Sequence, residues 1–266
     1  MDEKEVQVAL ECVKEVAKDA YADGGRPILK PTGELVGLVP RAIKAALLPV
    51  EKWVLAQEYN LAETKKLLEI RLENVPAEQI VSPEPHIAVP ALQYISYCMD
   101  NEELRNMYAN LLANSMNASK RDGVHPSFVE IIKQMCPDEA KLLKAFCETG
   151  MTIPVISVRY ENDTGSGIYV IKNFTDLGEQ AGCEEPLETQ KYFDNLARLG
   201  LVQLIDSLGS LTDKTLYEPL KNHNYILENI VLPDKARQRG YTKADIIESY
   251  VAITAFGRCF CKICFI

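Results

Sequence analysis

The residues of this chain best suited to proton transfer near neutral pH are its three histidines, His86, His125 and His223. An imidazole titrates at about pH 6.5, so each could act as a general acid or base beside a nucleophile. His125 is the best placed, because it stands at a predicted helix start and Glu130 follows on that helix. With Arg105 these two residues form a candidate catalytic set. A histidine before a helix-initiating proline is more often a capping or packing residue, so enzymatic activity is left uncertain and the sequence argues against it.

Cysteines are the residues that could bind a metal ion, and the densest group is Cys259, Cys261 and Cys264. A structural zinc site needs four ligands, usually as two pairs, and no second pair or nearby histidine completes this group. We therefore predict no metal site and expect packing cysteines on a terminal helix. The other thiols are scattered and the first residues lack the features of a secretory signal, which favours reduced thiols in a cytosol over a disulfide framework.

Two glycine-rich spots, Gly24-Gly25 and Gly165-Ser166-Gly167, could in principle approach a phosphate. Neither completes the spaced glycine patterns of nucleotide-binding loops. We interpret both as turns and predict no cofactor.

A length of 266 residues predicts two domains, which would position the candidate histidine, cysteine and glycine residues described above. Residues 1–136 form the predicted N-terminal helical domain, because apolar residues recur at helical spacing along most of it. Prolines predict breaks within 34–73 and an extended connector over 75–90. The boundary is placed at Cys136-Pro137-Asp138, where a proline-started helix begins and the pattern becomes mixed.

Residues 137–266 form the second predicted domain, which mixes strands with helices. A β-branched run predicts a strand over Ile153–Tyr160, and helices are predicted at about 173–182 and 187–199. The second helix ends at a glycine and a strand follows at once, as in a winged helix. The returning strand is placed at 250–254, so an insertion at about 207–249 separates the wing strands and carries a helix of its own. The predicted fold class is mainly α with a small β wing.

The net charge of −9 and the sequence pI of about 5.0 bear on possible partners. A phosphate backbone and an anionic bilayer would both be repelled overall. The helix predicted at about 187–199 would be the DNA-recognition helix of a winged helix. It carries Lys191 and Arg198 against Glu188 and Asp194, so it has no basic excess. The sequence argues against a nucleic-acid partner. A protein partner or self-association fits better.

Residues 35–50 are apolar almost throughout, with two basic residues among them. The stretch is too short and too interrupted by prolines for a membrane span, which needs about twenty apolar residues. A buried central helix of the first domain is one interpretation. Contact with a membrane surface after a conformational change is the other.

Several long strings agree in order and spacing with one known family. They are Glu102–Ala113, His125–Met135, Pro137–Leu143, Leu199–Val202 and Thr254–Gly257. From about residue 30 to its end the chain resembles the abortive-infection alpha (Abi-alpha) family, formerly a domain of unknown function. The resemblance implies a bacterial protein with a part in defence against bacteriophage, in which infected cells stop growing or die. It implies no catalytic residues, and the chain departs from the family pattern at Ala255, where a proline is expected.

The leading hypothesis is therefore a cytoplasmic phage-defence protein that acts through protein contacts or assembly. A membrane-perturbing effector that uses residues 35–50 is the first alternative. A winged-helix transcriptional regulator is another, and it would bind DNA in a salt-sensitive manner.

Overall fold

The computed structural model describes residues 61–205 and 209–265. The helices predicted before residue 61 lie outside these residues, and so does the apolar segment 35–50. The described chain is mainly α with a small β part, as predicted. In chain order, the elements are α3 Leu61–Leu72, η2 Ala77–Gln79, α4 Pro85–Ile95, α5 Glu102–Ser115, η3 Arg121–Gly123, α6 Ser127–Lys133, α7 Pro137–Thr149, β1 Thr152–Glu161, β2 Gly167–Phe174, α8 Leu177–Gln180, α9 Thr189–Arg198, β3 Val202–Ile205, η4 Lys214–Tyr217, α10 Glu218–Lys221, α11 Asn224–Asn229, α12 Asp234–Gln238, β4 Lys243–Ile253 and α13 Ala255–Cys264.

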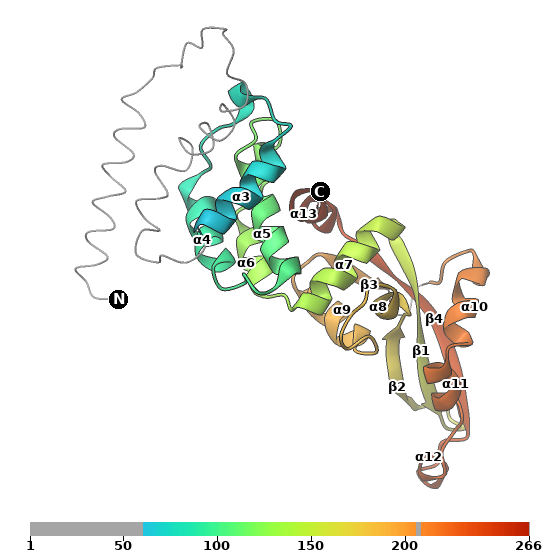
Figure 1. Ribbon diagram of the computed structural model, residues 1–266. Helices are drawn as coiled ribbons and strands as arrows, with labels where there is room; N and C mark the ends of the chain where they lie inside the picture. Colours follow the sequence, from blue (N-terminus) through green and yellow to red (C-terminus); the bar gives the residue numbers. More distant parts are fainter. Residues whose placement is uncertain (1–60, 206–208, 266) are drawn as a thin grey trace. The chain divides into compact units, whose positions relative to one another are not determined.

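Two compact units make up the described chain (Figure 1). The first contains residues 61–100 and 108–129, and the second contains residues 101–107 and 130–265. Helices α5 and α6 contribute residues to both units, so the division does not follow a single cut in the sequence. The domain boundary predicted after residue 136 stays a prediction.

The first unit is helical, and it buries the apolar faces of its helices. In α5, the hydroxyl of Tyr108 donates to the carbonyl of Val129 in α6 at 3.3 Å. An isolated antiparallel bridge between Ile80 and Asn117 ties the segment before α4 to the end of α5. The larger buried apolar side chains of the first unit are Leu68, Leu72, Ile87, Leu92, Ile95, Tyr108, Leu111, Leu112, Met116 and Phe128.

The extended connector predicted over 75–90 is wrong for its last residues, because α4 begins at Pro85. A proline fits the first helical position, where the missing N–H would have no partner within the helix. Pro90 lies inside α4 and removes a donor, at a local cost of about 3 kcal/mol. The helix continues nevertheless, since Ile87 and Leu92 are buried and each such side chain gains about 1.5 to 3 kcal/mol.

The second unit is organised around one antiparallel sheet with the strand order β2-β1-β4-β3. The central strand β1 pairs with β4 along its whole length, from Thr152 to Glu161. β3 pairs with the C-terminal end of β4, on the side of β4 away from β1, with Gln203 opposite Ala252. The strand pair predicted around Val202 and Ala252 is therefore present. The winged-helix topology itself stays a prediction.

Three parts of this unit differ from the sequence prediction. Residues 167–174 form β2; the sequence analysis predicted a turn up to Gly167 and a helix from about residue 173, and it predicted no strand between them. β4 begins at Lys243 instead of Tyr250, because it pairs with all of β1. The described part of the insertion between β3 and β4 carries the short helices η4, α10, α11 and α12 in place of one helix.

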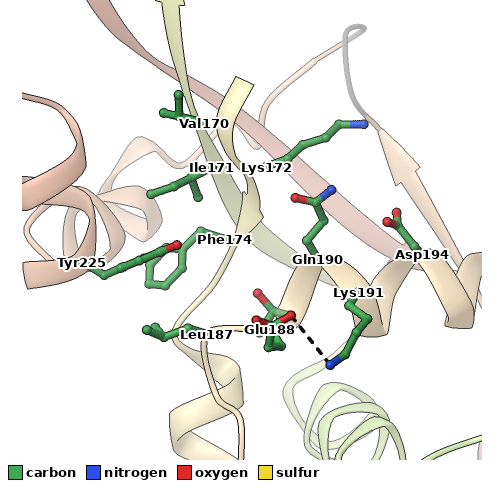
Figure 2. A pocket seen from close by; sticks show the side chains of 11 residues that line it. Val170, Ile171, Lys172, Phe174, Leu187, Glu188, Gln190, Lys191, Asp194 and Tyr225 are labelled. Carbon is green, nitrogen blue, oxygen red and sulfur yellow. Dashed lines mark ion pairs between the residues drawn. The ribbon is translucent and has the colours of Figure 1, made fainter. Parts of the chain in front are cut away.

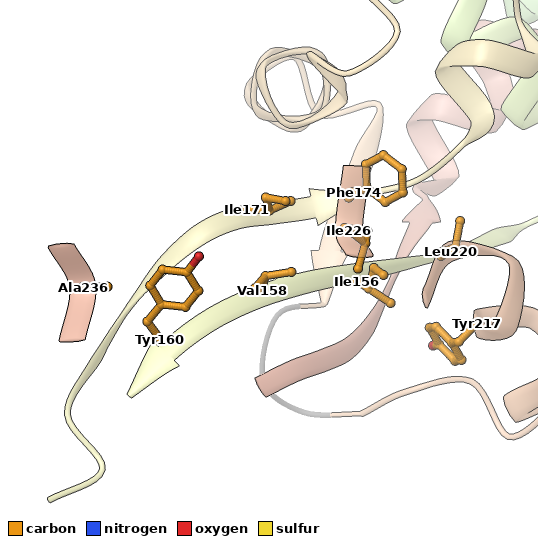
Figure 3. Packing of buried hydrophobic residues seen from close by; sticks show 9 residues of the cluster. All are labelled: Ile156, Val158, Tyr160, Ile171, Phe174, Tyr217, Leu220, Ile226 and Ala236. Atoms are coloured by element: carbon orange, nitrogen blue, oxygen red, sulfur yellow. The ribbon is translucent and has the colours of Figure 1, made fainter. Parts of the chain in front are cut away.

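One face of the sheet packs against this insertion (Figure 3). Alternate residues of β1, namely Ile156, Val158 and Tyr160, point to this face, as the period of two in a strand requires. The hydroxyl of Tyr217 donates to the carbonyl of Ser249 in β4 at 2.8 Å and so fixes η4 to the sheet. The other buried members of the cluster are Ile171, Phe174, Leu220, Ile226 and Ala236.

Helices α7 and α9 contact the sheet, α7 at β1 and α9 at β2 and β3. Figure 1 shows α9 on the side of the sheet away from α10 and α11. The step from α9 into β3 follows the prediction: Gly200 adopts a φ of 76° after the helix, and β3 begins at Val202. A glycine suits this position because side chains disfavour positive φ.

Helix α13 starts directly after β4 and packs closely on the chain between α9 and β3. Thr254 is its N-cap, accepting from the N–H of Gly257 at 2.8 Å and donating its hydroxyl to the carbonyl of Gly200 at 2.6 Å. A Cβ built on Gly257 would lie 2.0 Å from the carbonyl oxygen of Leu201. The close approach of two backbones therefore requires a glycine here.

Replacing Gly257 by alanine is expected to lower the free energy of unfolding by about 1 to 3 kcal/mol, because α13 must move away from Leu201. An alanine would otherwise favour a helix, so the predicted sign is opposite to that of helix propensity. Denaturant titration measures the change. Gly209→Ala is the matched control, since a Cβ there meets nothing within 4 Å. Equal stability of the two variants would contradict the close packing.

A disulfide joins Cys147 of α7 to Cys261 of α13, with their Cα atoms 6.6 Å apart. The prediction that the thiols are reduced is therefore corrected for this pair. Of the other cysteines on α13, Cys264 is buried, as a packing residue should be, whereas Cys259 is exposed. The sequence offered no sign of the pairing, because 114 residues separate the partners.

Candidate functional site

A pocket of about 390 Å³ lies beside the edge strand β2 in the second unit (Figure 2). Its volume is near the lower end of the range of small-molecule sites in proteins. β2 supplies one wall, the loop before α9 and α9 itself supply another, and α11 contributes one side chain. The lining residues are Val170, Ile171, Lys172, Phe174, Leu187, Glu188, Thr189, Gln190, Lys191, Asp194 and Tyr225.

A bulge shapes the β2 wall of the pocket. Between the residues that pair with Val158 and Ile156, two residues of β2, Lys172 and Asn173, stand opposite Ser157 alone. Asn173 adopts a φ of 54°, and its N–H donates to the hydroxyl of Ser157 at 3.0 Å. Asparagine tolerates this left-handed conformation better than most residues. A second register shift lies between the residues that pair with Arg159 and Val158, where Val170 is the extra residue of β2. The two irregularities bend the strand along the pocket, and pairing with β1 resumes at Phe174.

A buried carboxylate, that of Asp138 in α7, holds the second wall in place. Its two oxygens accept the N–H groups of Glu184 and Glu185, each at 2.9 Å. The hydroxyl of Tyr192 in α9 donates to the same carboxylate, also at 2.9 Å. One side chain therefore fixes both the loop before α9 and the helix.

The helix α9 is held further by the junction between α6 and α7. Asn195 donates through Nδ2 to the carbonyl of Gln134 at 2.9 Å and to Glu139 at 2.8 Å. The Arg198 guanidinium donates to the side-chain oxygens of Gln134 and Asn195. The other basic residue of α9, Lys191, lies 3.7 Å from a Glu188 carboxylate oxygen. Both cations of the predicted recognition helix thus have partners within the protein.

The charges that line the pocket balance, with Lys172 and Lys191 against Glu188 and Asp194. Its lining contains no cysteine, serine or histidine. The apolar part comes from both walls and from Tyr225, whose ring centre lies 5.7 Å from that of Phe174. The lining therefore combines charged and amide side chains with apolar ones, and it offers both polar and apolar contacts to a bound group.

The cysteines near the Asp138 carboxylate are poor nucleophiles. Burial, and then the charge of Asp138, raise the pKa of Cys183 to about 11. Burial also raises the pKa of Cys136. Because the thiolate is the reactive form, both thiols are weak nucleophiles near neutral pH.

The edge strand β2 is unusually apolar on its exposed side. Ile168, Tyr169 and Val170 are 44%, 48% and 37% exposed. Consecutive residues of a strand point to opposite faces, so both faces of this edge carry apolar surface. Val170 also lines the pocket, which makes the edge and the pocket one continuous surface.

The three residues proposed from the sequence do not line this pocket. His125 is exposed, and its Nδ1 accepts from the N–H of Ser127 at 3.2 Å and lies 2.6 Å from the hydroxyl of that residue. Its ring centre lies 5.9 Å from that of Phe128, so His125 caps and packs the start of α6. Glu130 is exposed on α6, and Arg105 is partly buried in α5. A catalytic role of this set stays a prediction.

Sequence reasoning named His223 as a possible acid or base but did not predict its structural role, which is to position a pocket residue. Its Nδ1 accepts from the N–H of Tyr225 at 3.2 Å and caps α11. Its Nε2 lies 3.1 Å from a carboxylate oxygen of Glu179, and its ring centre lies 4.9 Å from that of Phe174. The β-branched and aromatic run from Gly167 to Phe174 was the available signal for the strand wall.

Two classes of feature are not found within residues 61–205 and 209–265. No group of three or more histidine, cysteine, aspartate or glutamate side chains is placed there to hold a metal ion. No helix of these segments is long and apolar enough to cross a membrane.

Comparison with known proteins adds one family and one solved structure. The family model described as abortive infection alpha matches residues 56–264. No curated protein matches the chain. A similar solved structure is an uncharacterized protein from the hydrocarbon-degrading marine bacterium Alcanivorax borkumensis SK2, with 18% identity and a TM-score of 0.36 over 51% of this chain and 90% of that one.

Proposed function

The chain belongs to the abortive infection alpha family, and from this premise we propose that it defends bacterial cells against bacteriophage by stopping the growth of the infected cell. The family match over most of the chain is the observation that carries the proposal. The site of action proposed is the cytoplasm. The mechanism proposed is contact with another protein chain.

The lining of the pocket and the edge of β2 support a mechanism by protein contact. Three consecutive apolar side chains, Ile168, Tyr169 and Val170, are exposed there. Exposed apolar patches of this kind on a soluble domain mark interaction surfaces. The pocket beside them offers space for a side chain of the partner.

A DNA-binding role has no support from α9. In this helix the Arg198 guanidinium donates hydrogen bonds to Gln134 and Asn195, and the Lys191 ammonium lies beside the Glu188 carboxylate. A helix that reads DNA needs free cations for phosphate groups. The membrane alternative depends on residues 35–50, which lie outside the described chain.

Expression of the chain in a susceptible bacterial host is expected to lower the plaquing efficiency of at least one phage in a broad panel. At high multiplicity of infection the culture should stop growing or collapse, and at low multiplicity it should survive, because abortive infection removes infected cells before they release phage. An empty vector and a vector that carries a frameshifted copy are the controls. Unchanged plaquing across the panel would count against a role in defence.

A further inference from the structure

Helix α9 presents two polar side chains to the pocket that bind nothing else in the described chain. Gln190 and Asp194 both line the pocket, and they stand four residues apart, so they share one face of the helix. No hydrogen bond or ion pair joins either side chain to another described residue. By contrast, Asn195 and Arg198 of the same helix donate to Gln134. The face of α9 toward the pocket is therefore available to a ligand.

Among the charges that line the pocket, that of Asp194 has no opposite partner in the described chain. Lys191 lies 3.7 Å from Glu188, and Lys172 also has an interaction partner. An anionic ligand would therefore compete with these partners for each lysine, whereas a cationic group finds the Asp194 carboxylate available. Carboxylates form strong, charge-assisted hydrogen bonds with ammonium groups. Charge complementarity thus favours a ligand that carries a positive group.

The other side of the pocket is apolar. Figure 2 shows Phe174, Tyr225 and Leu187 on one side of the pocket, with Gln190 and Asp194 on the other. The ring centres of Phe174 and Tyr225 lie 5.7 Å apart, and Leu187 is 43% exposed. Such side chains gain free energy when a hydrocarbon or aromatic group covers them. A fitting ligand therefore has its positive group at one end and an apolar body at the other.

Both walls of the pocket are held by contacts within the protein. The Asp138 carboxylate fixes the loop before α9 and accepts from Tyr192 of the helix. On the apolar side, His223 caps α11, and its ring centre lies 4.9 Å from that of Phe174. A site whose walls are already in place loses little conformational entropy when a ligand binds.

The volume of the pocket, about 390 Å³, limits the size of the ligand. Sites for drug-sized molecules extend to more than twice this volume. A molecule with a single ring or a single branched side chain therefore suits the pocket better than a larger one.

We propose that the pocket beside β2 binds a small organic ammonium ion with an apolar body. The ammonium group donates to the Asp194 carboxylate and to the side-chain carbonyl of Gln190, and the apolar body covers Phe174 and Tyr225. Apolar amino acids and the corresponding amines share this chemistry. The site goes beyond the proposed contact with a protein partner, and its ligand would compete for the same pocket.

Isothermal titration calorimetry of the full-length chain with three phenyl compounds tests the required chemistry. Phenethylamine and L-phenylalanine, which carry an ammonium group, are expected to bind saturably. N-acetyl-L-phenylalanine keeps the ring but has no positive group, and it should bind at least about tenfold more weakly. Tighter binding of phenylalanine than of phenethylamine would identify amino acids as the ligands, and the reverse order would identify amines.

Replacing Asp194 by asparagine removes the charge and keeps the shape of the side chain. Asp194→Asn should raise the dissociation constant of phenethylamine at least about tenfold, because the ammonium group loses its ionised acceptor. Asp163→Asn is the matched control, since Asp163 is exposed in the turn 162–166 and does not line the pocket. It should leave the dissociation constant unchanged. Circular dichroism verifies that both variants are folded.

The proposal is overturned if neither ammonium compound binds up to its solubility limit, or if N-acetyl-L-phenylalanine binds equally well. Equal weakening by Asp194→Asn and Asp163→Asn would also refute it. Plaquing is measured separately with the wild-type chain. A chain that protects cells but binds no ammonium compound would leave the defence role intact and refute the site. A chain that binds these compounds without protecting cells would do the reverse.

Discussion

Replacement of Asp138 by alanine is expected to lower the free energy of unfolding by about 3 to 5 kcal/mol, the largest effect of any single substitution proposed for this protein. The carboxylate accepts two backbone N–H groups and the hydroxyl of Tyr192, and it is 6% exposed. Without it, these donors lose a charged acceptor in a site from which most water is excluded. The loop before α9 and the pocket wall should loosen together. Denaturant titration and hydrogen exchange measure both effects.

Tyr192→Phe is the control for this prediction, because it removes the hydroxyl that donates to the same carboxylate at 2.9 Å and to the carbonyl of Glu185 at 3.2 Å. It should cost about 1 kcal/mol in the wild-type chain and much less when Asp138 is already alanine. Equal costs in both backgrounds would mean that the two side chains act independently, in contradiction to the network.

The same carboxylate makes stability depend on acid pH. Burial disfavours the charged form of Asp138, but the N–H groups of Glu185 and Glu184 outweigh it and hold the pKa below its usual range. Tyr192 and the charge of Lys141 lower the pKa further. The stabilisation is therefore complete above the unfolded-state pKa of about 3.9 and is lost as pH falls through the lower folded-state pKa. Asp138→Asn should remove this acid dependence.

Reduction of the disulfide between Cys147 and Cys261 is expected to lower the free energy of unfolding by about 2 to 4 kcal/mol. The bond closes a loop of 114 residues, and a long loop restricts the unfolded chain more than a short one. Because it ties α7 to α13, the reduced protein should also lose hydrogen-exchange protection first in α13. Unfolding with and without a dithiol reductant measures the change.

The double variant Cys147→Ala, Cys261→Ala is the control for the reductant itself. Its stability should equal that of the reduced wild-type chain and should not respond to reductant. A wild-type chain with the same stability and the same count of free thiols under both conditions would refute the disulfide.

Much of the helical framework was predictable because its signals are local. The proline and acidic residues that open α7 lie within four residues of one another, and the apolar spacing of α9 repeats along ten residues. Gly200 marked the stop of α9 and hence the start of β3. The strand β1 was identified by its own β-branched content.

The functional surface was not predictable, because its parts come from distant segments. The pocket combines residues of β2, α9 and Tyr225, which converge only when the insertion folds back beside the sheet. His125 was correctly placed at a helix start, yet its neighbours in space are Ser127 and Phe128 of that same helix. The sequence showed the residue type and could not show which groups surround it.

By itself, then, the sequence determined the family, the fold class and most helices, since each depends on the order of residues or on contacts within a few positions. Only the tertiary structure decided that β2 is an exposed edge, that Asp138 binds the loop before α9, and that Cys147 meets Cys261. These features depend on contacts across 46 or 114 positions of the chain. The physical reason is that local propensity fixes the backbone of one segment at a time, whereas burial and pairing are settled when segments pack together.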